Sequence, residues 1–382
     1  MQNRSNKKVI IILLMLCCLV LIPVISCNKE KPEKQGVIKI GAILPLTGDL
    51  AFLGNSVKAG LIRAKNDLNL GKGEIELFFE DSKGEIRYGV SGAQRLMDIE
   101  KVSAIIAYQD GVCNAIIPMT RNKKVIQISM SMNPLISIQS EYSFTIFCTS
   151  KSEVPLQLEY IKHVKPNKIA VIYVNMPGHS YAVEDLLIPG MEAIGIPYEN
   201  IYKESIELTD RDFSSPITKI AKFKPDLIVA YILPTMLDRF YRKLSESSLS
   251  LNIPILGNMM GIGLPTVSPV YSKNTVFPAP AFFVKQDDNL IEFLQRVKDE
   301  LGAFPSLPEA IYGYDSLNII FNSIMNCNGN VERAKQYIAN LKNYKGLSGY
   351  INIDNDRNSL VDMILAVYKE EKFQAFEFGK ND

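Results

Sequence analysis

The stretch of this sequence that most resembles a catalytic arrangement is Gly178-His179-Ser180-Tyr181-Ala182. It follows an apolar, strand-like run and precedes a helical pattern, which is the context of the nucleophile elbow of a serine hydrolase. The triad of such an enzyme needs a histidine later in the chain than the serine. The only histidines are His163 and His179, and neither follows Ser180. The pattern therefore favours an ordinary strand-to-helix turn over serine hydrolysis, which we keep as the less favoured alternative.

Neither a metal nor a nucleotide cofactor is expected. Residues 354–358 alternate like the start of a calcium loop, but Ser359 stands where the glycine belongs and Leu365 where the bidentate glutamate belongs. The cysteines and two histidines match no zinc-site spacing. No glycine-rich loop ends in the Lys-Ser or Lys-Thr of a phosphate-binding loop.

The first 27 residues have the pattern of an export signal. Arg4, Lys7 and Lys8 precede an apolar run over residues 9–22, and the tetrapeptide Val-Ile-Ser-Cys ends at Cys27. A basic start, a short apolar core and small residues before the cut are typical of secretory signals, and the tetrapeptide resembles a bacterial lipobox. We predict a signal peptide over 1–26, lipidation of Cys27 and a flexible, charged tether over 27–36. An uncleaved anchor helix is the alternative, and both place the folded part outside the cytoplasmic membrane.

The charge balance makes nucleic acid an unexpected partner. The chain has 42 basic and 41 acidic residues. Cleavage before Cys27 would leave 39 against 41, a net charge of −2, and no basic patch of the kind that nucleic-acid binding needs. Beyond Cys27 only Cys113, Cys148 and Cys327 remain. This odd set allows at most one internal disulfide, and whether any forms is left open.

The opening of the folded part is a strand, a long loop and a helix. Residues 37–44 are apolar, and a polar loop is expected to end at Gly54. Val57, Leu61, Ala64 and Leu68 then recur at helical spacing, with Asn55 or Ser56 available as N-cap. In open parallel sheets, ligands bind beyond the carboxyl ends of the strands, so this loop is a candidate binding element.

Strand-like and helical patterns alternate along most of the chain, which predicts an α/β protein with two doubly wound parallel sheets. The first series has strands over 37–44, 75–80, 104–107 and 125–129. The second begins after Ser150 and has strands over 168–174, 200–204, 227–231 and 253–256, each followed by a helical pattern except the last. Two such sheets imply two lobes with a cleft where the strand ends face each other.

The order and spacing of several segments resemble the leucine/isoleucine/valine-binding family of bacterial solute-binding proteins. The resemblance covers nearly the whole chain after the signal and is carried by residues 40–60, 80–82, 133–134, 168–172, 212–214, 225–228 and 346–354. It implies a type I periplasmic-binding fold in which three hinge crossings join the lobes, near residues 149–152, 276–282 and 344–349. Lobe 1 would then comprise 37–150 and 283–344, and lobe 2 would comprise 151–282 and 345–382.

The resemblance also implies a function. We expect an extracytoplasmic, lipid-anchored and monomeric solute-binding protein, without enzymatic activity, that delivers an amino acid or related small molecule to the permease subunits of an ABC importer. A ligand sensor for a membrane receptor is the alternative. Closure of the two lobes about the hinge would hold the ligand.

At the positions that bind ligand in the family, this sequence matches the family less well than it does in the scaffold. Leu53 stands where a tyrosine is usual, Asp110 or Gly111 where a serine is usual, and Met259 where a glutamate holds the ammonium of an amino acid. The predicted ligand residues are Leu53, Asp110, Gly111, Ser131, Met132, His179, Tyr231 and Met259.

Met259 bears on the chemistry of the ligand. A buried ammonium needs an anionic partner, and with methionine at this position only Asp110 could supply one. Either Asp110 holds a cationic group in an inverted pose, or the ligand has no ammonium and Asp110 merely caps the helix that begins near Val112. We favour the second, because Leu53, Met132, Met259 and Met260 would form a soft apolar lining.

Overall fold

The computed structural model describes residues 36–69, 75–249, 253–301 and 306–379. Residues 37–382 form one compact unit. The predicted signal peptide, Cys27 and nearly all of the predicted tether lie outside the described residues. Within the described part, no helix is both long enough and apolar enough to span a bilayer.

The first sheet has five parallel strands in the order β2-β1-β3-β4-β5. Their bounds are β1 (Ile38–Leu44), β2 (Ile75–Asp81), β3 (Ala104–Tyr108), β4 (Ile126–Met130) and β5 (Ser143–Thr145). Successive side chains of a strand point to opposite faces of the sheet. In β1, Ile40 and Ala42 therefore join the core on one face, while Ile43 joins the core on the other.

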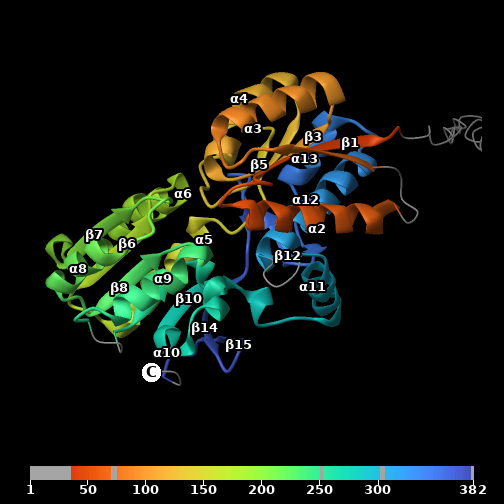
Figure 1. The fold of residues 1–382 in the computed structure, drawn as a ribbon. Coiled ribbons are helices and arrows are strands. Elements are labelled where there is room, and N and C mark those ends of the chain that lie inside the picture. Colours follow the sequence, from red (N-terminus) through yellow and green to blue (C-terminus); the bar gives the residue numbers. More distant parts are fainter. Residues whose placement is uncertain (1–35, 70–74, 250–252, 302–305, 380–382) are drawn as a thin grey trace, which may run out of the picture. The chain divides into compact units, whose positions relative to one another are not determined.

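Helices cover both faces of this sheet (Figure 1). One face carries α3 (Ile86–Arg95), the π-helical turn η1 (Leu96–Glu100) and α4 (Asp110–Lys123). The other carries α2 (Ala51–Asn69), α12 (Leu307–Asn326) and α13 (Val331–Ala339), with α11 (Asp288–Leu301) packed beside α2. We call this part of the molecule lobe 1.

The second sheet has seven strands in the order β15-β14-β10-β9-β8-β6-β7. The strands β6 (Ile169–Val174), β7 (Ile201–Ile206), β8 (Leu227–Tyr231), β9 (Ile255–Gly257) and β10 (Thr275–Pro280) are parallel. The strands β14 (Met363–Lys369) and β15 (Lys372–Ala375) add an antiparallel edge. This part is lobe 2, and the two parallel sheets confirm the predicted fold class.

The helical segments of lobe 2 mostly connect its strands. They are α5 (Ser150–Val164), α6 (Pro177–Ser180), η3 (Tyr181–Leu187), α7 (Ile188–Ala193), η4 (Tyr198–Asn200), α8 (Ser214–Phe223), α9 (Pro234–Ser245), η5 (Met259–Thr266) and α10 (Pro269–Ser272). Two further short turns, η2 (Ser137–Gln139) and η6 (Ala281–Phe283), lie before β5 and after β10.

Helix α2 begins earlier than the sequence predicts. The backbone N–H groups of Leu53 and Gly54 donate to the carbonyl of Leu50, so the expected loop already forms the first helical turn. Gly54, predicted as the end of the loop, lies inside the helix. The Pro45 carbonyl approaches it so closely that a larger residue would not fit. A Cβ at this position would lie 2.1 Å from that oxygen.

The third crossing between the lobes also differs from the prediction. A small antiparallel sheet of β11 (Tyr344–Gly346), β12 (Gly349–Ile353) and β13 (Ser359–Leu360) follows α13. Thr145 bridges to Asn358, and the N–H of Phe147 donates to Ser359 Oγ at 3.1 Å, so this segment packs on lobe 1. The chain enters lobe 2 only between β13 and β14, later than the predicted 344–349.

The remaining sequence features take structural roles. Residues 354–358 form the turn between β12 and β13, where Asp354 Oδ1 accepts the N–H of Asn358 at 2.8 Å and Asp356 pairs with Lys151 at 2.8 Å. Cys113, Cys148 and Cys327 are all free thiols. No group of three or more potential metal ligands occurs in the described residues.

Candidate ligand-binding site

A cavity of about 50 Å³ lies where the carboxyl ends of strands from the two sheets meet. Lobe 1 contributes the residues at or just after the ends of β3 and β4, with the first turn of α2. Lobe 2 contributes residues that follow β6, β8 and β9. The lining consists of Leu50, Leu53, Tyr108, Gln109, Asp110, Met130, Ser131, Met132, Phe147, Met176, His179, Leu233 and Met260.

Five of the eight predicted ligand residues line this cavity: Leu53, Asp110, Ser131, Met132 and His179. The other three do not. Gly111 lies on α4, where an added Cβ would contact Ile86. The hydroxyl of Tyr231 is buried and donates to Gln157 Oε1 at 2.6 Å. Met259 is fully buried behind its neighbour Met260, which does line the cavity.

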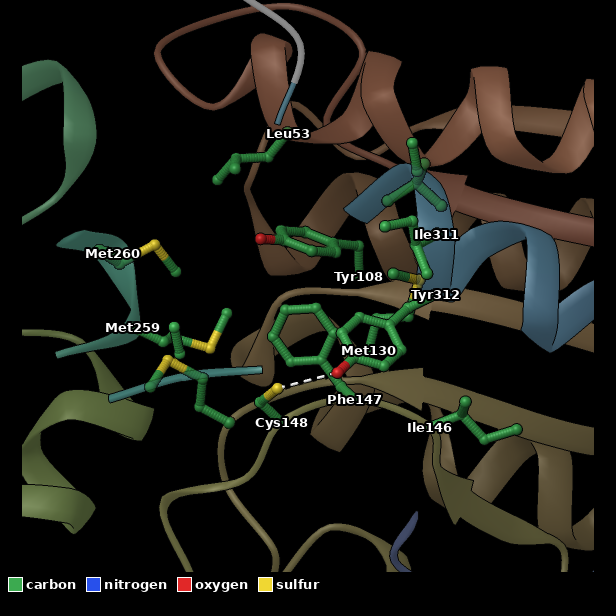
Figure 2. Packing of buried hydrophobic residues seen from close by; sticks show 14 of the residues in the cluster. Leu53, Tyr108, Met130, Ile146, Phe147, Cys148, Met259, Met260, Ile311 and Tyr312 are labelled. Atoms are coloured by element: carbon green, nitrogen blue, oxygen red, sulfur yellow. Dashed lines mark hydrogen bonds between the residues drawn. The ribbon is translucent and has the colours of Figure 1, made fainter. Parts of the chain in front are cut away.

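The apolar walls come from both lobes. Figure 2 shows Leu53 and Tyr108 on one side and Met260 on the other, with the Met260 side chain directed into the space between them. Methionine, leucine and phenylalanine supply most of the lining, and thioether side chains adapt readily to different apolar shapes. Of the soft apolar lining predicted from the sequence, Leu53, Met132 and Met260 line the cavity and Met259 does not.

The carboxylate of Asp110 is held by groups from both lobes. It accepts a short hydrogen bond from Ser131 Oγ, and the backbone N–H groups of Met132, Asn133 and Gly178 also interact with it. Burial raises the pKa of Asp110, and these donors act in the opposite direction. Asp110 is the first residue of α4, and Gln109 before it holds the N-cap position. The expectation that Asp110 merely caps a helix beginning near Val112 leaves out its hydrogen bond with Ser131 Oγ.

Gly178 is the point where lobe 2 comes closest to Asp110. A Cβ built on Gly178 would lie 2.3 Å from Asp110 Oδ2, so any larger residue would push the two apart. This close contact explains why the Gly-His-Ser-Tyr-Ala motif begins with glycine. Ser180 Oγ donates to Asn175 Oδ1 at 3.5 Å, while the ring of His179 packs edge-on against Tyr231. The Nε2 atom of His179 lies 3.4 Å from Nδ2 of Asn258.

Behind the wall of lobe 2 lies a buried carboxyl group that the sequence analysis missed. Glu153, only 1% exposed, accepts the backbone N–H of Met259 through Oε1 at 2.6 Å, and its Oε2 has no partner. Burial raises the pKa of Glu153 to about 8 and lowers that of His179 to about 4. Both groups are therefore uncharged near pH 7.

Lobe 1 has a comparable group. Glu309 Oε1 accepts the hydroxyl of Tyr108 at 3.0 Å, and its Oε2 accepts that of Ser306. Burial raises the pKa of Glu309 to about 7. Phe147 packs edge-on between Tyr108 and Tyr312, so this polar pair supports an aromatic wall of the cavity. Nearby, Cys148 Sγ lies 3.0 Å from the hydroxyl of Tyr312 (Figure 2).

Some of the missed residues carry a signal in the sequence and others do not. Tyr108 and Met130 are the last residues of buried parallel strands, which is where such sheets bind ligands. Applying that rule to every strand would have found them, and Met176 and Leu233 as well. Glu153 and Glu309 carry no such signal, because a glutamate in the first turn of a helix is ordinarily exposed.

Comparison with known proteins places this geometry in a wider context. The family model of the periplasmic binding proteins matches residues 37–368. A Leu/Ile/Val-binding protein homolog from Brucella melitensis is 26% identical over 190 residues, 48% of this chain and 51% of the relative. The chain thus aligns with about half the length of the curated relatives it matches.

Solved structures are similar to this protein over a larger share of the chain than the curated relatives are. A branched-chain amino acid transporter substrate binding protein from Streptococcus pneumoniae, in complex with isoleucine, has a TM-score of 0.75 at 20% identity, covering 89% of this chain and 98% of that one. A solute binding protein from R. palustris, in complex with benzoate, has a TM-score of 0.77 at 18% identity, covering 89% and 96%. These likenesses support the fold.

Proposed function

The chain belongs to the periplasmic binding protein family, and from this we propose that it binds a small organic solute in the cavity around Asp110, between lobes 1 and 2. The observation that carries the proposal is that residues beyond the carboxyl ends of strands in both sheets line one cavity. A ligand that contacts both lobes stabilises the state in which they are together.

The cavity is small for this purpose, which suggests a nearly closed state. Ligand pockets usually measure about 300–1,000 Å³, whereas this one measures about 50 Å³. Contacts between the lobes, such as Gly178 with Asp110 and the 3.1 Å ion pair of Arg211 with Asp49, hold them together. Entry of a ligand would require these contacts to separate.

We further propose that the protein serves an ABC importer as its lipid-anchored, extracytoplasmic component. The support is the family together with the lipobox-like tetrapeptide ending at Cys27. Changing Cys27 to Ser should abolish metabolic labelling with radioactive palmitate and leave an unprocessed precursor. Labelling that persists in Cys27→Ser would contradict the proposal that Cys27 carries the lipid anchor.

A stability screen tests solute binding. Residues 37–382, the compact unit, are heated with amino acids, amides, small acids and aromatic compounds. A ligand present at about 100 times its dissociation constant adds about 2.7 kcal/mol to the free energy of unfolding. At least one compound is expected to raise the melting temperature accordingly.

Two buried methionines provide a matched control for the screen. Met260 lines the cavity and Met97 lies in the core under α3, with exposed fractions of 4% and 6%. Both Met→Ala changes should lower the melting temperature. Only Met260→Ala should reduce the increment caused by the ligand, and an equal reduction in Met97→Ala would place binding elsewhere.

A further inference from the structure

The carboxylate of Asp110 occupies a position where hydrogen-bond donors converge. The hydroxyl of Ser131 and the backbone N–H groups of Met132, Asn133 and Gly178 all interact with it. A hydroxyl and a fan of backbone N–H groups form the kind of concavity in which proteins hold anions. A carboxylate has about four acceptor sites, and these donors compete with any ligand group for those of Asp110.

The rest of the lining offers no positive charge to a second anion. No lysine or arginine lines the cavity in the described part of the chain. His179 is in the lining but stays uncharged near pH 7, because burial lowers its pKa. A carboxylate on the ligand would therefore lose its hydration beside the carboxyl group of Asp110 without a compensating positive charge, which is costly.

Two side-chain atoms of the lining residues, Gln109 Oε1 and His179 Nδ1, lack a hydrogen-bond partner, and the first suits an uncharged donor on a ligand. Gln109 Oε1 is buried and accepts no hydrogen bond. Gln109 is also held at a φ of 80°, in the left-handed region, directly before Asp110. Strained backbone of this kind persists where the surrounding structure fixes it, often at binding sites. An amide N–H or a hydroxyl of a ligand would satisfy this oxygen.

We propose that Asp110 is an internal carboxylate that fills the anion-binding end of the cleft, and that the bound solute is mainly apolar, uncharged and free of a carboxylate. Asp110 is thus the residue that decides specificity against acids. This inference rests on the proposed function, because it concerns the ligand of the same cavity.

Isosteric pairs of acids and amides test the inference on the wild-type, full-length chain. Titration calorimetry compares benzamide with benzoate and isovaleramide with isovalerate, which differ little in size. The amide of a pair should bind at least about tenfold more tightly than the acid, and leucine, isoleucine and valine should bind more weakly than about 10 μM. An acid that binds more tightly than its amide, or leucine tighter than that limit, would overturn the inference.

Removing the internal carboxylate should create a site for acids. In Asp110→Ala, the Ser131 hydroxyl and the surrounding N–H groups become available. Formate should then raise the melting temperature of the variant but not of the wild type, and benzoate should gain at least about tenfold in affinity. The double variant Asp110→Ala/Ser131→Ala should lose most of this gain. Asp110→Asn, which fills the same volume without charge, should show none.

The outcomes separate the inference from the proposed function. A folded Asp110→Ala variant that gains affinity for no carboxylate overturns the inference, even if the wild type binds a solute well. Formate binding by the variant supports the inference, even if the wild type responds to no compound in the screen, a result that would count against the proposed function alone. If Asp110→Ala does not fold, the acid and amide pairs still decide.

Discussion

At the scale of residues, three buried acidic groups lie in or beside the cleft and differ in their hydrogen-bond partners. The carboxylate of Asp110 accepts from Ser131, each oxygen of Glu309 accepts a hydroxyl, and only one oxygen of Glu153 has a partner. Because desolvation penalises the charged form of a carboxyl group, burial raises the pKa of Glu153 to about 8 and that of Glu309 to about 7. Both are therefore sources of pH-dependent stability.

Glu153 should make the protein less stable as the pH rises. Its pKa is about 8 in the folded chain against an ordinary value of 4.5 for glutamate, so between these pH values the folded chain keeps a proton that the unfolded chain has released. The free energy of unfolding then falls by at most about 1.4 kcal/mol per pH unit in that window. Glu153→Gln should show a smaller drop in melting temperature between pH 5 and pH 8 than the wild type.

The control for this prediction lies on the same helix. Glu159 is exposed on α5, so Glu159→Gln should retain the pH dependence of the wild type. Glu309→Gln should reduce the dependence in the same direction as Glu153→Gln, over a window that ends about one unit lower. Equal pH dependence in the wild type and Glu153→Gln would contradict the assigned state of Glu153.

Residue types alone predicted the cleft only in part. Leu53, Asp110, Ser131, Met132 and His179 could be placed because they follow predicted strands or open the helix that follows β1. The role of Asp110 could not be derived, because its partner Gly178 is 68 positions later in the chain and belongs to the other lobe. Met259 and Met260 are adjacent in the chain, and the predicted ligand residue Met259 is fully buried while its neighbour Met260 lines the cavity.

At the scale of elements, close helix packing depends on glycine. Gly60 of α2 lies against the backbone of α12, where an added Cβ would lie 2.0 Å from the carbonyl oxygen of Ala310. Gly313 of α12 faces α2 in the same way, since an added Cβ there would lie 2.8 Å from the Val57 carbonyl oxygen. The pair of glycines lets the two helices approach closely over the same face of the five-stranded sheet.

Gly60→Ala should therefore destabilise the protein although alanine favours helices. Overpacking of a tight interface typically costs about 1–3 kcal/mol, and here the obstacle is backbone, which cannot rotate away. The expected result is a lower urea midpoint with an unchanged slope. Gly111→Ala is the control, since its Cβ would meet only the Ile86 side chain at 3.5 Å, and that change should be neutral or slightly stabilising. Equal midpoints for the two variants would refute the packing argument.

Element positions were largely predictable, because buried parallel strands are continuous apolar runs. The strands β3, β4, β6 and β8 fall within one residue of their predicted bounds. The start of α2 was missed because Gly54 suggested a loop, although in the structure it serves close packing against Pro45. The third crossing was placed too early because the sequence of β11 to β13 shows only that these segments are strands. Their contacts with Thr145 and Phe147 assign them to lobe 1, and the sequence does not reveal such contacts.

At the scale of the whole molecule, the proposed function requires two lobes that close on a solute. The sequence predicted two sheets and a cleft between them, because each alternating series of strands and helices completes a sheet of its own. Which side chains meet across the cleft could not be predicted, since this depends on the relative placement of the lobes. Asp49 with Arg211 and Asp110 with Gly178 are contacts of this kind.

Small-angle scattering of residues 37–382 with and without a ligand tests the central claim most directly. If the lobes close about a solute, the radius of gyration must be larger in the free protein and must decrease when the tightest ligand of the stability screen is added in excess. Gly178→Ala, which would separate the lobes at Asp110, should reduce this decrease. A tightly bound ligand that leaves the radius of gyration unchanged would contradict the account of closure.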